Sequence, residues 1–394
     1  MPKTQKRILI APDNFKSSID ANTAAQAIAR GINRANPDIA CHLFPMADGG
    51  DGTAQTLTRQ LHGQWIEREI PSPDSLPIMA GFGWQPDTQQ AVIDVASCGG
   101  LADIGPGDLW QRNSYGVGVL LRVILERNPR EIMIGLGGSA SNDAGAGLLA
   151  ALGYRFFDKH NQALNPTPAG LSDLHHIDSQ HRDPRLLDTQ LTILSDVENS
   201  LCGPQGATAV YGPQKGAKAD DIAALDQRLG WIARILWQHH AAQQPAPEDE
   251  ANAVSPPSSE QADYGRCSGA AGGLGFALQL LPNANVVPGA QTIAERLGLT
   301  AQLNTADGLI TGEGCFDHSS LQGKVVGTLL RLAQPYSLPC IVLAGQRAEG
   351  VAVPEHTQVI SLTQWYGSER KAQTQATLGL ETCAHQLALA HWCL

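Results

Sequence analysis

The densest group of chemically useful residues lies at 132–147, where an apolar start is followed by glycines and short polar side chains. This order predicts a buried strand, a tight turn and the start of a helix. Gly137 and Gly138 let the backbone approach a ligand closely. Three polar side chains follow them: Ser139, Ser141 and Asn142. Donors near a helix N-terminus attract anions, so the segment predicts an anion-binding turn in an α/β protein.

Asp143 ends this polar run and points to different chemistry. A carboxylate beside an anion-binding turn is suited to hold a metal ion or to accept a proton. The structural alternative is that Asn142 or Asp143 caps the helix and that the glycines only turn the chain. Both interpretations stay open on this segment alone.

Further carboxylates and lysines fall where other predicted strands end, which is where ligands of open α/β sheets bind. They are Asp13 and Lys16 after a strand at 7–11, Asp48 and Asp51 after 41–46, Asp196 and Asn199 after 191–194, and Glu313 and Asp317 after 307–311. Lys215 lies in a predicted glycine-rich loop over 203–217, and Lys324 begins a predicted helix. Glycine, carboxylate and lysine at several strand ends suit phosphoryl transfer with a metal ion. A solvated loop is the plain alternative for Asp13 and Lys16.

The elements that would position these residues alternate between strands and helices, with one interruption. Three segments between 65 and 95 alternate apolar and polar residues, which predicts an antiparallel meander. A β-rich unit within a β/α pattern indicates an inserted domain, and 394 residues favour two domains. Residues 243–263 hold four prolines and five acidic residues without Lys or Arg, which predicts a flexible surface loop.

Composition excludes several classes of protein. A formal net charge of −11 argues against a nucleic-acid-binding or membrane-surface protein. The first apolar run is too short for a signal peptide and no run is long enough to cross a membrane, so we expect a cytoplasmic protein. The eight cysteines are scattered without metal-binding spacing, which indicates reduced thiols rather than a zinc site.

Two common ligand-binding motifs, the P-loop and the EF-hand, do not match the sequence. Gly323-Lys324 is not a phosphate-binding P-loop, because His318 and Val325 stand where that motif needs glycine and Ser or Thr. The acidic residues at 48–51 do not begin an EF-hand calcium loop, because its twelfth position is Arg59.

Taken together, the segments resemble the bacterial type-1 glycerate kinases. The matching stretches are 11–16, 47–53, 137–147, 195–199, 212–217, 269–275 and 311–324. The resemblance implies a Rossmann-like, flavodoxin-like α/β domain built from 1–64 and 288–394, with a second mixed α/β domain at 65–287 inserted into it. It also implies ATP-dependent phosphorylation of D-glycerate. The expected product is 2-phosphoglycerate, with 3-phosphoglycerate as the alternative.

On this basis each site residue has an expected role, and all are expected around one cleft. Lys16, Lys215 and Lys324 neutralise phosphate or the glycerate carboxylate, with Lys16 also catalytic. Asp196 or Asp143 accepts the hydroxyl proton. Asp48 holds Mg²⁺ with Glu313 or Asp317. Contacts to substrate or phosphate are expected from Asp13, Lys16, Gly137, Gly138, Ser139, Ser141, Asn142, Asn199, Lys215 and Lys324.

Three positions depart from the family pattern: Cys315 and Tyr115 stand where arginine is common, and Ser200 stands where proline is usual. One alternative is therefore a kinase of another small hydroxy acid. A second is a non-catalytic regulator that binds a nucleotide or sugar acid, although carboxylates at strand ends would not help a pure binder of anions. The expected partners are D-glycerate and ATP, and association into a homo-oligomer stays open.

Overall fold

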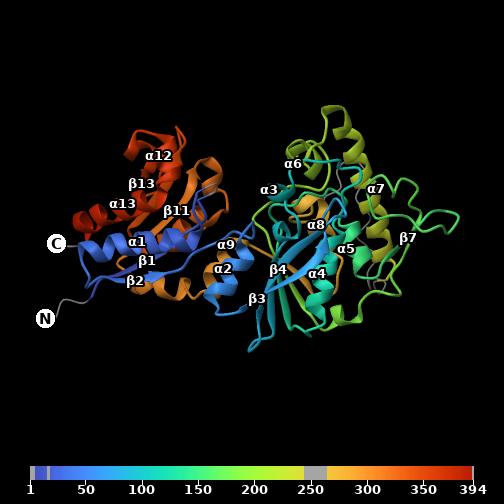
Figure 1. Cartoon of the computed structure of the whole chain (residues 1–394), viewed down its shortest axis with the longest axis horizontal. Helices are drawn as coiled ribbons and strands as arrows, with labels where there is room; N and C mark the ends of the chain where they lie inside the picture. The colour runs from blue at the N-terminus through green and yellow to red at the C-terminus, as the bar shows by residue number, and fades with distance from the viewer. Residues whose placement is uncertain (1–4, 16–17, 244–263, 393–394) are drawn as a thin grey trace. The chain divides into compact units, whose positions relative to one another are not determined.

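The computed structural model describes residues 5–15, 18–243 and 264–392, and it divides into two compact units (Figure 1). Unit 1 comprises residues 1–48, 59–61 and 288–394, and unit 2 comprises 49–58 and 62–287. The acidic segment predicted as a surface loop lies outside the described residues, apart from Gln243. The domain bounds given above stay a prediction about independently folding parts.

Unit 1 is built on a five-stranded parallel sheet. Its strands, in spatial order, are β13 (Thr357–Ser361), β12 (Cys340–Arg347), β11 (Gly308–Phe316), β1 (Arg7–Pro12) and β2 (Ala40–Leu43). From the β2 edge, these are the second, first, third, fourth and fifth strands of the unit along the chain. This is the strand order of flavodoxin-like folds, and its switch point lies between β1 and β11. The predicted Rossmann-like fold class is confirmed.

The helices of unit 1 follow the apolar spacing of the sequence. They are α1 (Ala21–Ala35), α9 (Gly289–Arg296), α10 (Val325–Ala333), α11 (Leu362–Tyr366), α12 (Glu369–Thr374) and α13 (Ala376–His391). Asp20 caps α1 by accepting a hydrogen bond from the Thr23 N–H at 2.6 Å. In Figure 1, α1 and α13 lie side by side, and a Cβ on Gly31 would come within 2.1 Å of the Glu381 carbonyl oxygen. Glycine is therefore required where these two helices touch.

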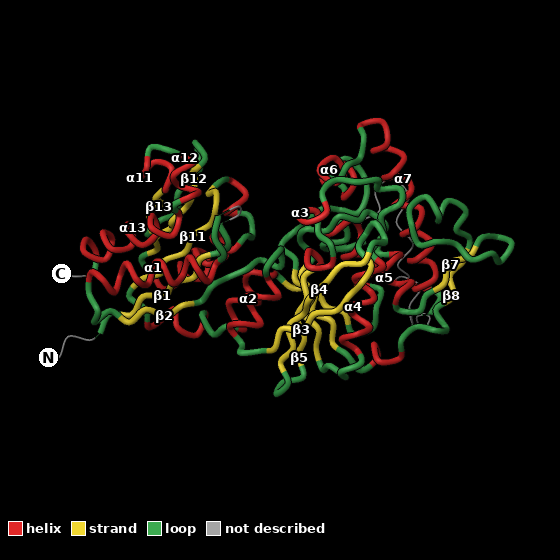
Figure 2. Tube along the Cα trace, in the orientation of Figure 1, coloured by secondary structure: helices red, strands yellow, loops and turns green. Residues whose placement is uncertain are grey.

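Unit 2 contains a six-stranded mixed sheet (Figure 2). Its spatial order is β10 (Ala284–Val287), β9 (Gln190–Leu194), β6 (Glu131–Gly135), β5 (Gln90–Asp94), β4 (Pro77–Gln85) and β3 (Gln64–Pro71). The first four strands are parallel, and β4 and β3 continue the sheet antiparallel, as the predicted meander requires. β7 (Arg155–Phe157) and β8 (His176–Asp178) form a separate antiparallel pair.

The sheet of unit 2 is accompanied by helices, most of which bury apolar residues in a core that includes Leu120, Leu148 and Ile134. They are α2 (Thr53–Gln60), α3 (Leu101–Ile104), α4 (Tyr115–Leu125), α5 (Ala146–Ala151), α6 (Ala207–Lys215), α7 (Ile222–Ala241) and α8 (Leu274–Gln279).

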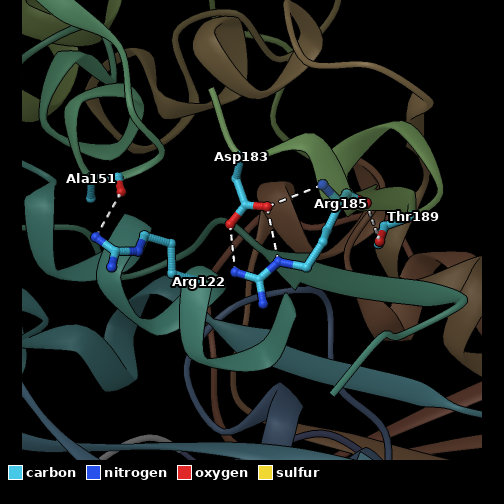
Figure 3. A network of polar contacts seen from close by, with 5 residues as sticks. All are labelled: Arg122, Ala151, Asp183, Arg185 and Thr189. Carbon is cyan, nitrogen blue, oxygen red and sulfur yellow. Dashed lines mark hydrogen bonds and ion pairs between the residues drawn. The ribbon is translucent and has the colours of Figure 1, made fainter. Parts of the chain in front are cut away.

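A polar network fixes the segment that leads into β9 (Figure 3). The Asp183 carboxylate accepts hydrogen bonds from the Arg185 Nε at 2.9 Å and Nη2 at 2.7 Å, and the Arg185 carbonyl accepts one from the Thr189 hydroxyl at 2.9 Å. The Arg185 guanidinium lowers the pKa of Asp183, and the charge of Arg122 on α4 adds to this effect. The network fixes the residues just before β9, and Asp196 follows the other end of this strand.

Several predicted element boundaries are wrong. The strand predicted over 41–46 ends at Leu43, and the strand predicted over 307–311 continues to Phe316 as β11. The glycine-rich loop predicted over 203–217 is largely helix, because α6 runs from Ala207 through Pro213 to Lys215. Pro213 lies in the last turn of α6, where its missing N–H removes one hydrogen bond from the helix, and α6 ends two residues later.

Candidate active site

The switch point of unit 1 is held together by backbone hydrogen bonds. Asp13 follows β1, and its N–H donates to the Gly312 carbonyl on β11 at 2.8 Å. The Asn14 N–H donates to the Asp13 carboxylate at 2.7 Å, while the Asn14 side-chain oxygen accepts from the Ala21 N–H at 2.8 Å. The loop after β1 is thus tied to both β11 and α1. Lys16 lies outside the described residues.

A cavity of about 310 Å³ opens at this edge of the sheet. It contains most of the predicted site residues of unit 1: Asp13, Asp48, Glu313, Asp317 and Lys324. It is also lined by residues that the sequence patterns missed, among them Gln346, Thr363, Glu369 and Gln373. They were not predicted because Gln346 near the end of β12 and the residues of the short helices α11 and α12 belong to no recognisable motif.

Glu313 is the most constrained carboxylate of this cavity. Its side chain is only 7% exposed, and among the described residues its Oε1 atom has no hydrogen-bond partner. Burial raises the pKa of Glu313 to about 7, and the nearby Asp317 and Asp48 carboxylates act in the same direction. Hydrogen bonding to Ser320 and the charge of Lys324 oppose this shift. A buried carboxylate oxygen of this kind needs a proton, a donor or a cation.

Lys324 is oriented by a short chain of hydrogen bonds. Its Nζ atom donates to the Ser319 hydroxyl at 2.7 Å, and that hydroxyl donates to the Asp317 carboxylate. Asp317 also accepts from the Ser319 N–H at 2.8 Å and from the Ser320 N–H at 3.1 Å, which closes a capping box. These bonds lower the pKa of Asp317. Asp317 therefore holds the turn that places Lys324 at the start of α10.

The three predicted metal ligands, Asp48, Glu313 and Asp317, share this cavity. Among the described residues, no group of three or more His, Cys, Asp or Glu side chains is arranged to hold a metal ion. Mg²⁺ in kinases usually takes only one or two carboxylates and completes its shell with water and phosphate. The Glu313 Oε1 atom, which has no hydrogen-bond partner among the described residues, lies near Asp48 and fits that smaller donor set.

In unit 2, the predicted anion-binding segment forms an irregular loop over 136–145, and α5 begins only at Ala146. The Gly137 N–H donates to the Gly49 carbonyl at 3.1 Å, and a Cβ on Gly137 would lie 2.5 Å from the Gly50 Cα. Gly138 has a φ of +77° and is exposed. Both glycines are thus required by the path of the chain itself, which is the structural alternative stated above.

The polar side chains of this loop are buried rather than presented on a surface. The Ser139 hydroxyl donates to the Ala271 carbonyl at 3.2 Å, and the Asn142 amide donates to the Thr208 hydroxyl at 3.0 Å. The cavity beside Ser139 and Ser141 measures about 10 Å³. That is room for about one water and none for a phosphate.

Lys215 reaches the same loop from the end of α6. It is 4% exposed, and its Nζ atom donates to the Ser141 carbonyl at 2.8 Å. Burial lowers the pKa of Lys215 to about 8, and the Asp143 carboxylate opposes this shift. An ammonium can donate three hydrogen bonds, and Lys215 donates one of them to the Ser141 carbonyl.

Asp143 is fully buried, and its carboxylate accepts four hydrogen bonds. They come from the Ser114 N–H and hydroxyl, both at 2.8 Å, from the Gly147 N–H at 3.0 Å and from the Gly145 N–H at 3.1 Å. Burial raises the pKa of Asp143 while these bonds oppose the shift. The geometry favours a role in holding α4 and α5 together, and Ser114 is a partner that no sequence pattern indicated.

The loop after β9 holds the other two predicted site residues. The Asn199 side chain has a structural role, because its amide donates to the Gln205 carbonyl at 2.9 Å and its oxygen accepts from the Tyr211 hydroxyl at 2.7 Å. Asp196 is half-buried. The predicted residues therefore fall into two groups, one in each unit, and the expectation that they serve one reaction stays a prediction.

Unit 1 is an open parallel sheet, and the cavity at its switch point is lined by carboxylates and a lysine. These features define an α/β enzyme that binds its ligand at the strand ends. The chain belongs to the glycerate kinase family, whose model matches residues 8–391. This is a family of phosphotransferase enzymes, so the predicted family and enzyme class are confirmed.

Individual relatives agree with this assignment. The chain is 37% identical to a glycerate kinase of Haemophilus influenzae over 86% of its own length and 85% of the relative. It is 33% identical to the glycerate 2-kinase of Escherichia coli, covering 88% and 87%. A putative glycerate kinase 2 from Salmonella typhimurium superimposes with a TM-score of 0.79 at 30% identity, over 98% of both chains. Within the described part of the chain, no helix has the length and apolarity to span a membrane.

The burial of Asp143 predicts a loss of stability on substitution. Asp143→Asn places an amide donor against N–H donors, so it should lower the free energy of unfolding by about 1–3 kcal/mol. The matched change Asp196→Asn, in a half-buried loop, should alter it by less than about 0.5 kcal/mol. Urea denaturation of both variants measures the difference, and equal stabilities would contradict the structural role of Asp143.

The burial of Lys215 predicts a pH dependence with a defined sign. Burial lowers the pKa of Lys215 to about 8 in the folded protein, whereas the pKa of the free side chain is 10.5. Between these values the unfolded chain binds more protons, so the contribution of Lys215 to stability rises with pH. The melting temperature of the wild type, relative to Lys215→Met, should therefore increase from pH 8 to pH 10.5. A constant difference would show that Lys215 is not buried as an ammonium.

Proposed function

We propose that the protein is an ATP-dependent kinase of D-glycerate, with 2-phosphoglycerate as the product and 3-phosphoglycerate as the alternative. The observation that carries this proposal is the cavity at the switch point of unit 1, where the unpartnered Glu313 carboxylate oxygen lies with Asp48 and Lys324. Phosphoryl transfer consists mostly of positioning and charge neutralisation, and these side chains supply both.

Asp48 and Glu313 would hold the Mg²⁺ ion, while Asp317 is engaged in orienting Lys324. When bound, Mg²⁺ neutralises the charge of the nucleotide phosphates. Lys324 adds a positive charge at the start of α10, and Lys16 and Lys215 remain the proposed cations for phosphate or the glycerate carboxylate. Gly137, Gly138, Ser139, Ser141 and Asn142 shape the loop that receives the Lys215 side chain.

Of the two candidate bases, we propose Asp196. Asp143 would have to give up hydrogen bonds to Ser114, Gly145 and Gly147 before it could accept a proton. Asp196 lies half-buried at the carboxyl end of β9, where a substrate hydroxyl can reach it. We further propose a cytoplasmic location, since the seven described cysteines are free, which suits a reducing compartment.

A second candidate substrate is another small hydroxy acid. It is favoured by Tyr115, which is exposed at the start of α4 at a position where the family commonly has arginine. Loss of that cation changes the charge that a substrate meets.

The assay that tests the proposal combines the protein with ATP, Mg²⁺ and either D-glycerate or a panel of hydroxy acids. Phosphorus NMR should show ADP and 2-phosphoglycerate with D-glycerate. Asp196→Asn should lower kcat by at least about 10²-fold, because the proton acceptor is lost.

The matched control is Glu198→Gln, which removes the same charge from an exposed side chain of the same loop. It should leave kcat nearly unchanged. Turnover with a different acid alone would favour the second candidate, and full activity of Asp196→Asn would reject Asp196 as the base.

A further inference from the structure

The size of the unit 1 cavity already limits its ligand. At about 310 Å³ it falls within the range of about 300–1,000 Å³ that is typical of sites for drug-sized or cofactor-sized molecules. Glycerate, a three-carbon acid, would leave most of that space unfilled. A nucleotide is the larger of the two substrates of a glycerate kinase.

The cavity is chemically uneven along the sheet. Asp48, Glu313 and Lys324 belong to the side of β2, β1 and β11, and they carry charge. Toward β12 and β13 the lining is mostly neutral, with Gly345, Thr363, Ala372, Gln373 and Ala376, and it includes the exposed Glu369 carboxylate at the start of α12. One part of the cavity suits a polyanion with its cation, and the other suits an uncharged ring and sugar.

Small residues in the neutral part are imposed by the fold. A Cβ on Gly345 would lie 2.5 Å from the Gly314 carbonyl oxygen, so β12 and β11 present bare backbone to the cavity at this point. The Thr363 hydroxyl donates to the Gly345 carbonyl at 2.9 Å, which ties α11 to the same site. A flat aromatic base can lie against such a backbone surface, while the Gln346 and Gln373 amides offer donors and acceptors for its edges.

The Glu313 oxygen supplies an independent indication of the ligand. It is more than nine-tenths buried, lines the cavity and has no partner among the described residues. The carboxylate of glycerate would be repelled by it and by Asp13, Asp48 and Asp317, because like charges in a partly desolvated site are costly. A nucleotide that arrives as a complex with a divalent cation brings the missing positive charge with it.

We infer that this cavity binds the nucleoside triphosphate of the reaction as its divalent-cation complex, with the phosphates toward Asp48, Glu313 and Lys324 and the nucleoside against Gly345, Ala372 and Ala376. The inference rests on the proposed kinase function and adds to it the assignment of the nucleotide, rather than glycerate, to unit 1.

Cys315 makes this assignment testable without measuring turnover. It lines the cavity and is exposed, whereas the other described cysteines are buried or half-buried. We expect MgADP or a non-hydrolysable MgATP analogue to slow alkylation of Cys315 by N-ethylmaleimide at least about fivefold, and D-glycerate to leave it unchanged. Peptide mass spectrometry reports the rate at each cysteine, and half-buried Cys202 of unit 2 serves as the internal control.

A variant that fills the cavity with a larger side chain provides a second test of the same site. Cys315→Trp should raise KM for ATP at least about tenfold with little change in KM for D-glycerate, because the added ring occupies nucleotide space. Leu378→Trp, which adds the same ring at an exposed position of α13, should change neither constant. A melting curve of each variant shows that it is folded.

Each outcome has one meaning. Protection of Cys315 by D-glycerate but not by nucleotide would overturn the inference, as would protection by neither. Protection by nucleotide in a protein that phosphorylates no hydroxy acid would leave the inference standing and reject the proposed function instead.

Discussion

The pairing of β1 with β11 is the constraint on which the candidate site depends. These neighbouring parallel strands bring Asp13, from near the N-terminus, and Glu313, about three hundred residues later, to one edge of the sheet. The same pairing buries Glu313 and leaves its Oε1 atom without a partner in the described chain. Burying a carboxylate costs free energy, and under the proposed function this cost keeps an oxygen available to a cation at this edge.

Unit 2 shows the opposite use of a buried carboxylate. Asp143 is satisfied by the backbone of the Ser114 and Gly147 segments, and it fixes the loop that Lys215 reaches through the Ser141 carbonyl. Residue type alone does not separate these two uses. The number of hydrogen-bond donors around each carboxylate does separate them. Asp143 accepts four hydrogen bonds and has a positioning role, whereas the Glu313 Oε1 atom accepts none in the described chain and is available to a ligand.

The sequence predicted the parts that depend on local patterns. The strand before Asp13 and the start of α10 at Lys324 follow from the local sequence, and the alternation of strands and helices predicts an α/β protein, whereas the flavodoxin-like fold was implied by the family resemblance. It could not predict that residues 203–217 contain a helix, because Gly212-Pro213 is typical of a turn and only packing retains it in α6. Nor could it indicate Gln346 or Thr363, which join the cavity through tertiary contacts alone.

The most direct test of the account is the affinity of Mn²⁺, used in place of Mg²⁺, for the ADP-bound protein, measured by water-proton relaxation. Glu313→Gln should weaken this affinity at least about tenfold without lowering the melting temperature, because it removes a ligand charge whose burial is costly. Glu355→Gln, an exposed change in the same unit, should have no effect. Unchanged Mn²⁺ affinity in Glu313→Gln would contradict the claim that the switch-point cavity holds the cation.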